Sequence, residues 1–235
     1  MTPDAFPIMT RFPAEHPDLL QLYTLATPNG VKISILLEEL GLAYEAHRVG
    51  FGEDGTGSPE FHSFSRNGKI PAILDPDGPD GKPLALFESG AILLYLADKH
   101  HRFIGRDPAE RIEVIQWLFW QMAGMGPMFG QVGFFYRYAG AEYEDKRPRD
   151  RYIAEAQRLL GVLDARLQDR EWVAGDYSIA DMAMLGWVRG LDVHYEANEI
   201  IGLARFANVS VWLERGLARP AVQRGLEVPV DPAAP

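Results

Sequence analysis

Residues 66–95 contain polar groups whose types and spacing suit the binding of a small peptide-like anion. Ile70-Pro71 places a tertiary amide at the head of a short apolar strand, where a cis bond costs far less than at other residues. Such a bend leaves the backbone N–H and C=O of Ile70 directed outward, free to pair with a ligand backbone. An apolar helix then begins at Glu88-Ser89, where the Ser89 hydroxyl and the first backbone N–H groups suit a carboxylate. A buried strand and a capped helix explain either fragment alone, but their order and spacing together favour a binding site.

A second group of donors lies at the turn formed by residues 26–30, Ala-Thr-Pro-Asn-Gly. The alternation of apolar and polar residues over 20–25 predicts a half-buried strand before this turn. Apolar residues at helical spacing over 31–40, followed by Gly41, predict a helix after it. Thr27 and Asn29 therefore lie near a helix N-terminus, although Thr-Pro-Asn-Gly is also a good turn sequence whatever it binds.

The order of predicted elements changes near residue 100. Strand, helix, strand, short helix, hairpin and helix give an α/β domain over 19–100, preceded by a proline-rich arm over 1–18. From Asp107-Pro108, which has the form of an N-cap followed by proline, the patterns are almost wholly helical, so 107–229 is predicted to be an all-α domain. Ser178-Ile-Ala-Asp181 is a variant capping box, to which we assign a role in folding.

Composition limits the function further. The chain has 235 residues and a net charge of −10, which argues against nucleic acid or an anionic membrane as the main partner. Residues 1–17 lack the pattern of a secretory signal and no apolar stretch is long enough to span a bilayer, so a cytoplasmic protein is expected. Cysteine is absent, which removes any cysteine nucleophile or thiolate metal site from the chain. Histidine spacing gives no metal motif, and neither a metal nor a nucleotide cofactor is expected.

The motifs resemble those of the glutathione transferase superfamily, and among its members the nu class. This is a bacterial group related to the yeast nitrogen-regulator and prion fold. The resemblance covers about residues 19–229 and is carried by Thr-Pro-Asn-Gly at 27–30, Asn-Gly-Lys-Ile-Pro-Ala at 67–72, Phe-Glu-Ser-Gly-Ala-Ile-Leu-Leu-Tyr-Leu at 87–96 and Gln-Trp-Leu-Phe-Trp-Gln at 116–121. It implies a thioredoxin-like α/β domain followed by an all-α helical bundle, a homodimer, and glutathione as co-substrate.

The resemblance also implies residue roles. Thr27 would donate to the glutathione sulfur and Asn29 would contact glutathione. The remaining contacts implied for glutathione are Lys69 at its glycyl end, the Ile70 backbone before Pro71, Glu88 and Ser89 at its γ-glutamyl group, and Arg151. A solvent-exposed helix arginine explains Arg151 equally well. Residues 134–138 are aromatic where members of the class differ from one another; they suit a flat or apolar acceptor, or a core.

The function implied is glutathione-dependent reduction of small or glutathionyl disulfides. A cysteinyl thiol has a pKa of roughly 8.5, so the site must stabilise the thiolate. Two alternatives remain open on the sequence. One is conjugation of glutathione to electrophiles, or peroxide reduction, at the same site. The other is a non-catalytic glutathione-binding or regulatory protein. The physiological acceptor, and whether one or two glutathiones bind, are left open.

Overall fold

A mixed four-stranded sheet lies at the centre of the first of two units. The structure, a computed structural model, describes residues 1–2 and 4–230. It divides into one compact unit from Met1–His100 and Pro220–Pro235, and another from His101–Arg219. The strand order is β2-β1-β3-β4, in which β1 (Leu20–Thr24) runs parallel to β2 (Tyr44–Arg48) and antiparallel to β3 (Ala72–Asp75), and β3 runs antiparallel to β4 (Leu84–Phe87). Leu22 pairs with Ala46 on one side and with Ile73 on the other.

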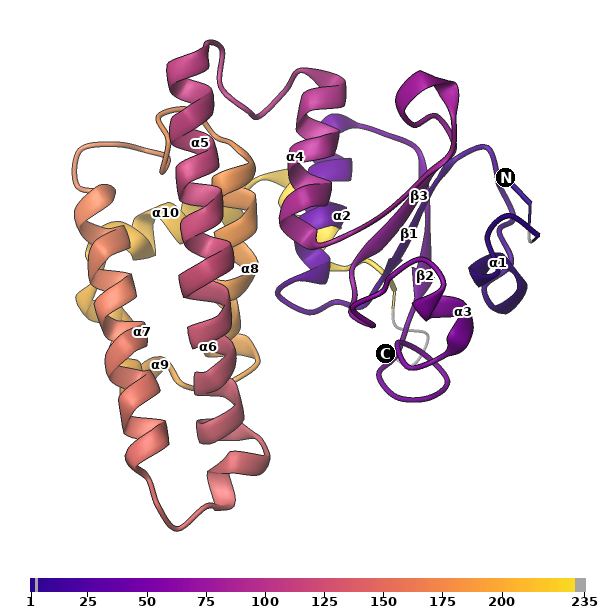
Figure 1. Cartoon of the computed structure of the whole chain (residues 1–235). Helices are drawn as coiled ribbons and strands as arrows, with labels where there is room; N and C mark the ends of the chain where they lie inside the picture. Colours follow the sequence, from indigo (N-terminus) through magenta and orange to yellow (C-terminus); the bar gives the residue numbers. More distant parts are fainter. Residues whose placement is uncertain (3, 231–235) are drawn as a thin grey trace. The chain divides into compact units, whose positions relative to one another are not determined.

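Helices cover both faces of this sheet, as Figure 1 shows. On one face lie α2 (Gly30–Leu40) and α4 (Ser89–His100), and on the other lie α1 (Ile8–Arg11) and α3 (Pro59–His62). A 3-10 turn, η1 (Pro79–Gly81), lies in the loop between β3 and β4. The predicted sequence of strand, helix, strand, short helix, hairpin and helix is confirmed, and with it the thioredoxin-like first half of the fold.

The arm over residues 1–18 packs on the sheet rather than extending away from it. Ile8 and Met9 are buried in one cluster with Tyr23 of β1 and Phe61 of α3. Arg11 donates from Nε to the Asp54 carbonyl at 2.9 Å and pairs with its carboxylate at 3.0 Å. The proline-rich sequence predicted an arm but gave no indication of the single helical turn that carries these two apolar side chains.

The C-terminal helix α11 (Pro220–Leu226) belongs to the first unit. Ser34 of α2 donates to the Gly225 carbonyl at 2.5 Å, and a Cβ on Gly225 would lie 2.6 Å from the Ile35 backbone. Glycine is therefore what allows α11 to approach α2 so closely. Residues up to 229 were predicted to belong to the helical domain, whereas this helix packs on the thioredoxin-like part.

The second unit is helical in the described residues, as predicted. Its elements are α5 (Pro108–Trp120), η2 (Gln121–Met125), α6 (Gly126–Val132), η3 (Gly133–Arg137), η4 (Ala139–Glu142), α7 (Arg147–Arg166), α8 (Ile179–Val193), α9 (Asn198–Ile201), η5 (Leu203–Arg205) and α10 (Ala207–Leu217). Here η2 and η3 are π-helical turns, and η4 and η5 are 3-10 turns.

The start of α8 confirms the predicted capping box. Ser178 Oγ accepts a hydrogen bond from Ala180 N at 3.3 Å, and the Asp181 carboxylate accepts one from Ser178 N at 3.1 Å. The same carboxylate accepts bonds from Val173 N and from the Trp212 indole, at 3.0 and 2.9 Å. This box therefore ties α8 to α10 as well as starting the helix, which supports the folding role given to it.

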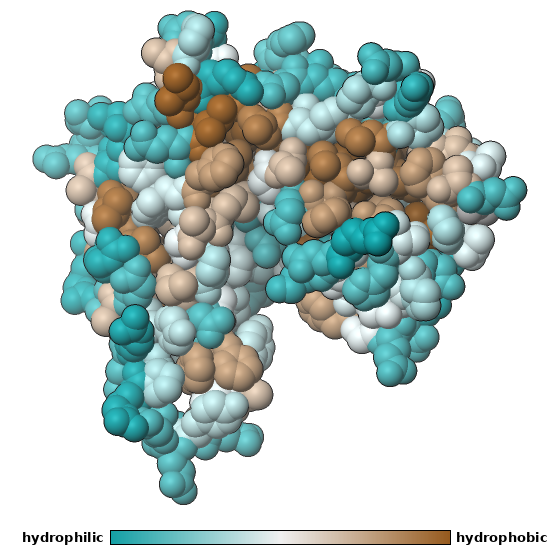
Figure 2. Space-filling view, viewed as in Figure 1, coloured by the Kyte–Doolittle hydropathy of each residue, from teal (hydrophilic) through white to brown (hydrophobic). Residues whose placement is uncertain are grey.

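Among the described residues, the helices are all too short or too polar to cross a bilayer. Figure 2 shows hydrophobic and hydrophilic residues intermingled on the face in view. Large apolar side chains are exposed at separate positions, including Phe51 in the first unit and Ile112 and Phe119 in the second.

Candidate functional site

The turn between β1 and α2 holds Thr27 at the N-terminal end of the helix. Thr27 Oγ accepts a hydrogen bond from Gly30 N at 3.2 Å, and the Thr27 carbonyl accepts one from Val31 N at 3.0 Å. A threonine oxygen that accepts an N–H can direct its own hydrogen elsewhere, toward an incoming sulfur. Thr27 and Asn29 are both half-buried, which leaves them within reach of a ligand.

Glycine at position 30 makes this turn possible. A Cβ there would lie 1.9 Å from the Leu25 carbonyl oxygen, so any other residue would push the helix away from the strand. The close approach places the first N–H groups of α2 beside the end of β1. These N–H groups and the helix dipole favour a negative charge at this point.

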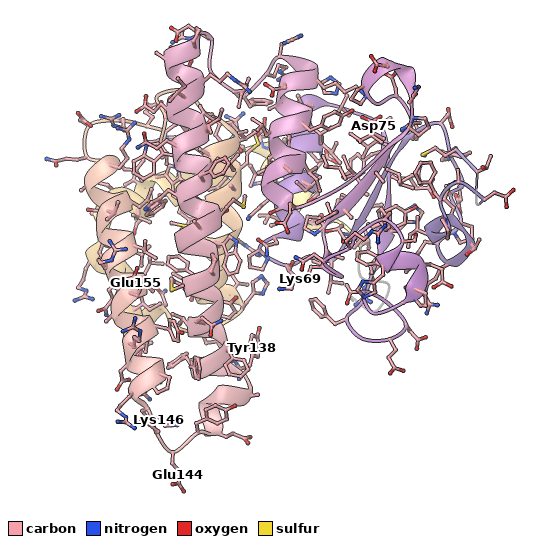
Figure 3. All side chains as sticks on the ribbon, in the orientation of Figure 1. Lys69, Asp75, Tyr138, Glu144, Lys146 and Glu155 are labelled. Atoms are coloured by element: carbon pink, nitrogen blue, oxygen red, sulfur yellow. The ribbon has the colours of Figure 1, made fainter. Side chains whose placement is uncertain are left out.

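The segment before β3 forms a second part of the site. The Ile70-Pro71 peptide bond is cis, as the sequence analysis expected. Lys69 is exposed, and Figure 3 shows it at the end of β3 opposite to Asp75. Its carbonyl accepts a hydrogen bond from Ser65 Oγ at 3.1 Å, which fixes the backbone just before Ile70.

Glu88 and Ser89 form the third part, at the start of α4. Glu88 has a φ of 72°, in the left-handed region that non-glycine residues rarely adopt, and its carbonyl accepts the Ile92 N–H at 2.9 Å. Such backbone strain is concentrated at binding and catalytic sites. The Glu88 side chain is exposed and accepts a hydrogen bond from Asn67 Nδ2 at 3.2 Å, which joins this part to the segment before β3.

Lys32 connects the first part of the site to the third. Its side chain is 1% exposed, and its Nζ lies 3.3 Å from Ser89 Oγ. Burial lowers the pKa of the Lys32 ammonium to about 7, and the nearby Glu88 carboxylate opposes this shift.

Lys32 was not among the predicted site residues, because a lysine within a helix ordinarily faces solvent. A signal was nevertheless present. Apart from Ser34, the residues that surround it over 31–37 are apolar on all sides of the helix, a pattern typical of a helix without a solvent face. In the structure every residue from Gly30 to Leu37 is buried.

Two further sequence predictions fall in the second unit. Arg151 is exposed on α7, and its role in binding stays a prediction. In the aromatic segment 134–138, Phe135 stacks on Tyr152 with ring centroids 5.5 Å apart, and Phe134 contacts Phe135 edge to face. Phe134 is partly exposed, so this segment forms an aromatic cluster that is neither wholly core nor wholly surface.

In the first unit, Thr27 and Asn29 lie at the start of α2, whose Lys32 contacts Ser89 of α4, and Asn67 before β3 contacts Glu88. Two helix N-termini, a hydroxyl and a buried ammonium suit anionic groups, a thiolate and a carboxylate among them. Within the described part of the chain, no three His, Asp or Glu side chains are grouped in a way that could hold a metal ion. These groups therefore suit an anionic ligand.

Both halves of the chain match domains of one protein family. The glutathione S-transferase N-terminal domain family matches residues 27–99, and the glutathione S-transferase C-terminal domain family matches residues 127–220. The disulfide-bond oxidoreductase YfcG of Escherichia coli (strain K12) is 44% identical over 210 residues, which is 88% of this chain and 94% of that protein.

Solved structures of similar proteins contain glutathione. A glutathione transferase from Pseudomonas putida, with one glutathione disulfide bound per subunit, is 59% identical with a TM-score of 0.95, over 97% of this chain and 100% of that one. A glutathione transferase family member from Pseudomonas fluorescens pf-5, with two glutathione bound, is 58% identical with a TM-score of 0.94, over 96% and 100% of the two chains.

Proposed function

Because the chain belongs to the glutathione S-transferase family, we propose that it reduces small or glutathionyl disulfides with glutathione. The observation that carries this proposal is the turn at Thr27, where a hydroxyl that accepts the Gly30 N–H is placed at a helix N-terminus. The chain has no cysteine, so the attacking thiol must come with the ligand. The similar protein YfcG, named a disulfide-bond oxidoreductase, supports the same assignment.

The reaction consists of two thiol–disulfide exchanges. The thiolate of bound glutathione attacks one sulfur of the disulfide, the S–S bond breaks, and the other sulfur leaves as a thiolate that takes up a proton. A second glutathione, deprotonated in turn, attacks the mixed disulfide and yields glutathione disulfide and the second thiol. One glutathione disulfide per subunit, as in the Pseudomonas putida structure, and two bound glutathione molecules, as in the Pseudomonas fluorescens structure, would be the product and substrate states of such a site.

The protein's part is to stabilise the thiolate. With its oxygen engaged by Gly30 N, the Thr27 hydroxyl donates to the sulfur, and the N-terminus of α2 adds positive potential. Both effects lower the pKa of the bound thiol. Asn29, the backbone of Lys69 and Ile70, and Glu88 with Ser89 hold the peptide part of glutathione, with Arg151 as a further anion contact.

Three finer assignments belong to the same proposal. We place the chain in the nu class, as a cytoplasmic homodimer. The Thr-Pro-Asn-Gly turn supports the class. Light scattering coupled to gel filtration tests the dimer: a mass of twice 26.3 kDa is expected, and the mass of one chain would contradict it.

The decisive experiment compares turnover of hydroxyethyl disulfide with glutathione against conjugation of chlorodinitrobenzene. Rapid disulfide reduction with feeble conjugation is expected. Thr27→Ala should lower disulfide turnover about 10- to 100-fold, the value of one hydrogen bond to a charged sulfur, and change glutathione affinity little. Thr27→Ser, which keeps the hydroxyl, should restore turnover, and Thr10→Ala, at an exposed threonine of α1, is the matched control.

The other outcomes of these assays would each indicate a different function or a different role for Thr27. Fast conjugation with slow disulfide reduction would assign the chain to the conjugating transferases. Glutathione binding without either activity would identify a regulatory binder. Unchanged turnover in Thr27→Ala would remove Thr27 from the mechanism.

A further inference from the structure

Lys32 has no role in the reaction as described so far, although its position is unusual for a lysine. The side chain is 1% exposed, and its Nζ lies 3.3 Å from the hydroxyl of Ser89, which is itself 7% exposed. Placing an ammonium group out of water costs free energy unless charge or hydrogen bonding offsets the loss. An apolar side chain such as methionine would fill the same space without that cost.

The chemistry of the two groups fixes the direction of their hydrogen bond. An ammonium group has three donors and no acceptor, so Lys32 donates and the Ser89 oxygen accepts. The hydroxyl hydrogen of Ser89 is thereby turned away from Lys32. Since Ser89 is the first residue of α4, the N–H groups of the first turn of that helix lie beside the hydroxyl.

An anion at this point would further stabilise the buried ammonium group. Burial is the main cause that lowers the pKa of Lys32 to about 7, and the nearby carboxylate of Glu88 only partly offsets it. A ligand carboxylate bound by Ser89 would bring a second negative charge toward the ammonium. Charge-assisted hydrogen bonds of this kind are about twice as strong as neutral ones.

We propose that Lys32 is a positioning residue for the γ-glutamyl carboxylate of glutathione, acting through Ser89. Its ammonium holds the Ser89 oxygen as an acceptor, directs the hydroxyl hydrogen to the carboxylate, and lends that contact its positive charge. The inference rests on the proposed function, since it assumes that glutathione is the ligand at this site.

The test measures the affinity of two ligands for wild-type protein and Lys32→Met by titration calorimetry. The first ligand is glutathione. The second is 4-aminobutanoyl-cysteinyl-glycine, which lacks only the carboxylate of the γ-glutamyl group. Lys32→Met should bind glutathione roughly 10-fold more weakly, the effect of losing a charge-assisted hydrogen bond, and bind the second ligand as wild-type protein does.

Two controls make the result specific. Lys82→Met removes an exposed lysine of the β3–β4 loop and should leave both affinities unchanged. The ethyl ester of the glutathione glycyl carboxylate should show the same dependence on Lys32 as glutathione does, because its γ-glutamyl end is intact. A purely structural role for Lys32 would instead weaken all three ligands alike.

The outcomes separate this inference from the proposed function. If wild-type protein fails to bind glutathione, the proposed function fails first. If wild-type protein prefers glutathione over the decarboxylated ligand and Lys32→Met keeps the same preference, the role of Lys32 is refuted while the function stands. Should Lys32→Met fail to fold, Lys32→Gln supplies a neutral donor; failure of both to fold would assign Lys32 to stability and overturn the inference.

Discussion

Asp181 in the helical unit and Lys32 in the thioredoxin-like unit are both buried ionisable residues, yet they are held in different ways. The Asp181 carboxylate accepts hydrogen bonds from Val173 N, from the backbone and hydroxyl of Ser178, and from the Trp212 indole. These donors all belong to the protein. The site around Asp181 is therefore closed, and its function is to hold α8 in place.

The ammonium of Lys32 faces a group that has its own place in the candidate binding site, Ser89. Burial shifts the pKa of each residue toward its neutral form, upward to about 6 for Asp181 and downward to about 7 for Lys32. A shifted pKa thus does not distinguish a structural charge from a functional one. The difference lies in whether the partners are donors used only by the fold or a hydroxyl placed for a ligand.

Removing the Asp181 carboxylate should have the largest effect on stability. Asp181→Ala leaves the N–H groups of Val173 and Ser178 and the Trp212 indole without their acceptor, and should lower the free energy of unfolding by about 3–5 kcal/mol. Urea unfolding followed by circular dichroism measures this. Asp169→Ala, at an exposed position, should change stability by less than about 0.5 kcal/mol. A loss below about 1 kcal/mol at Asp181 would show that the network contributes little.

A single hydrogen-bond donor to the Asp181 carboxylate should contribute less to the free energy of unfolding than the carboxylate itself. Trp212→Phe removes the indole N–H that lies 2.9 Å from Asp181 and should cost about 1–3 kcal/mol. In the Asp181→Ala background the same change should cost less, because the bond is already lost. Additive effects would indicate that the cost comes from lost ring packing alone, and Trp120→Phe, at a half-buried tryptophan of α5, measures the general cost of that replacement.

The buried ammonium of Lys32 should be visible mainly in the pH dependence of stability. The pKa of Lys32 is lowered from 10.5 to about 7 by burial, so between these values the unfolded chain binds more protons than the folded one. Stability from this group therefore rises with pH across this window, by at most about 1.4 kcal/mol per pH unit. Lys32→Met should flatten the rise between pH 7.5 and 9, as measured by urea unfolding at each pH. An identical slope in both proteins would contradict the assignment.

Several features of the site were predictable because they depend on local sequence. The cis bond at Ile70-Pro71, the helix start at Ser89 and the capping box of Ser178 and Asp181 each follow from a few neighbouring residues. The succession of strands and helices along the first hundred residues, and with it the α/β class, followed from the alternation of patterns there, whereas the order of strands within the sheet was not predicted.

The features that escaped prediction depend on contacts between distant segments. The burial of Lys32 requires α2 to pack against α4, and its contact with Ser89 spans 57 residues of sequence. The left-handed backbone at Glu88 has no marker in the residue type, since glycine is the usual occupant of that region. The place of α11 depends on Gly225 meeting Ile35, which no local pattern could indicate.

The position of α11 also has a consequence for how the protein is made. The thioredoxin-like unit is discontinuous, since Met1–His100 is completed by a helix that follows the whole of His101–Arg219. On the ribosome, which adds residues from the N-terminus, Ser34 can reach the Gly225 carbonyl only after the whole of His101–Arg219 has been made. Residues Met1–His100 therefore emerge before the helical unit but reach their final packing after it, and α2 lacks the cover of α11 throughout translation of that unit.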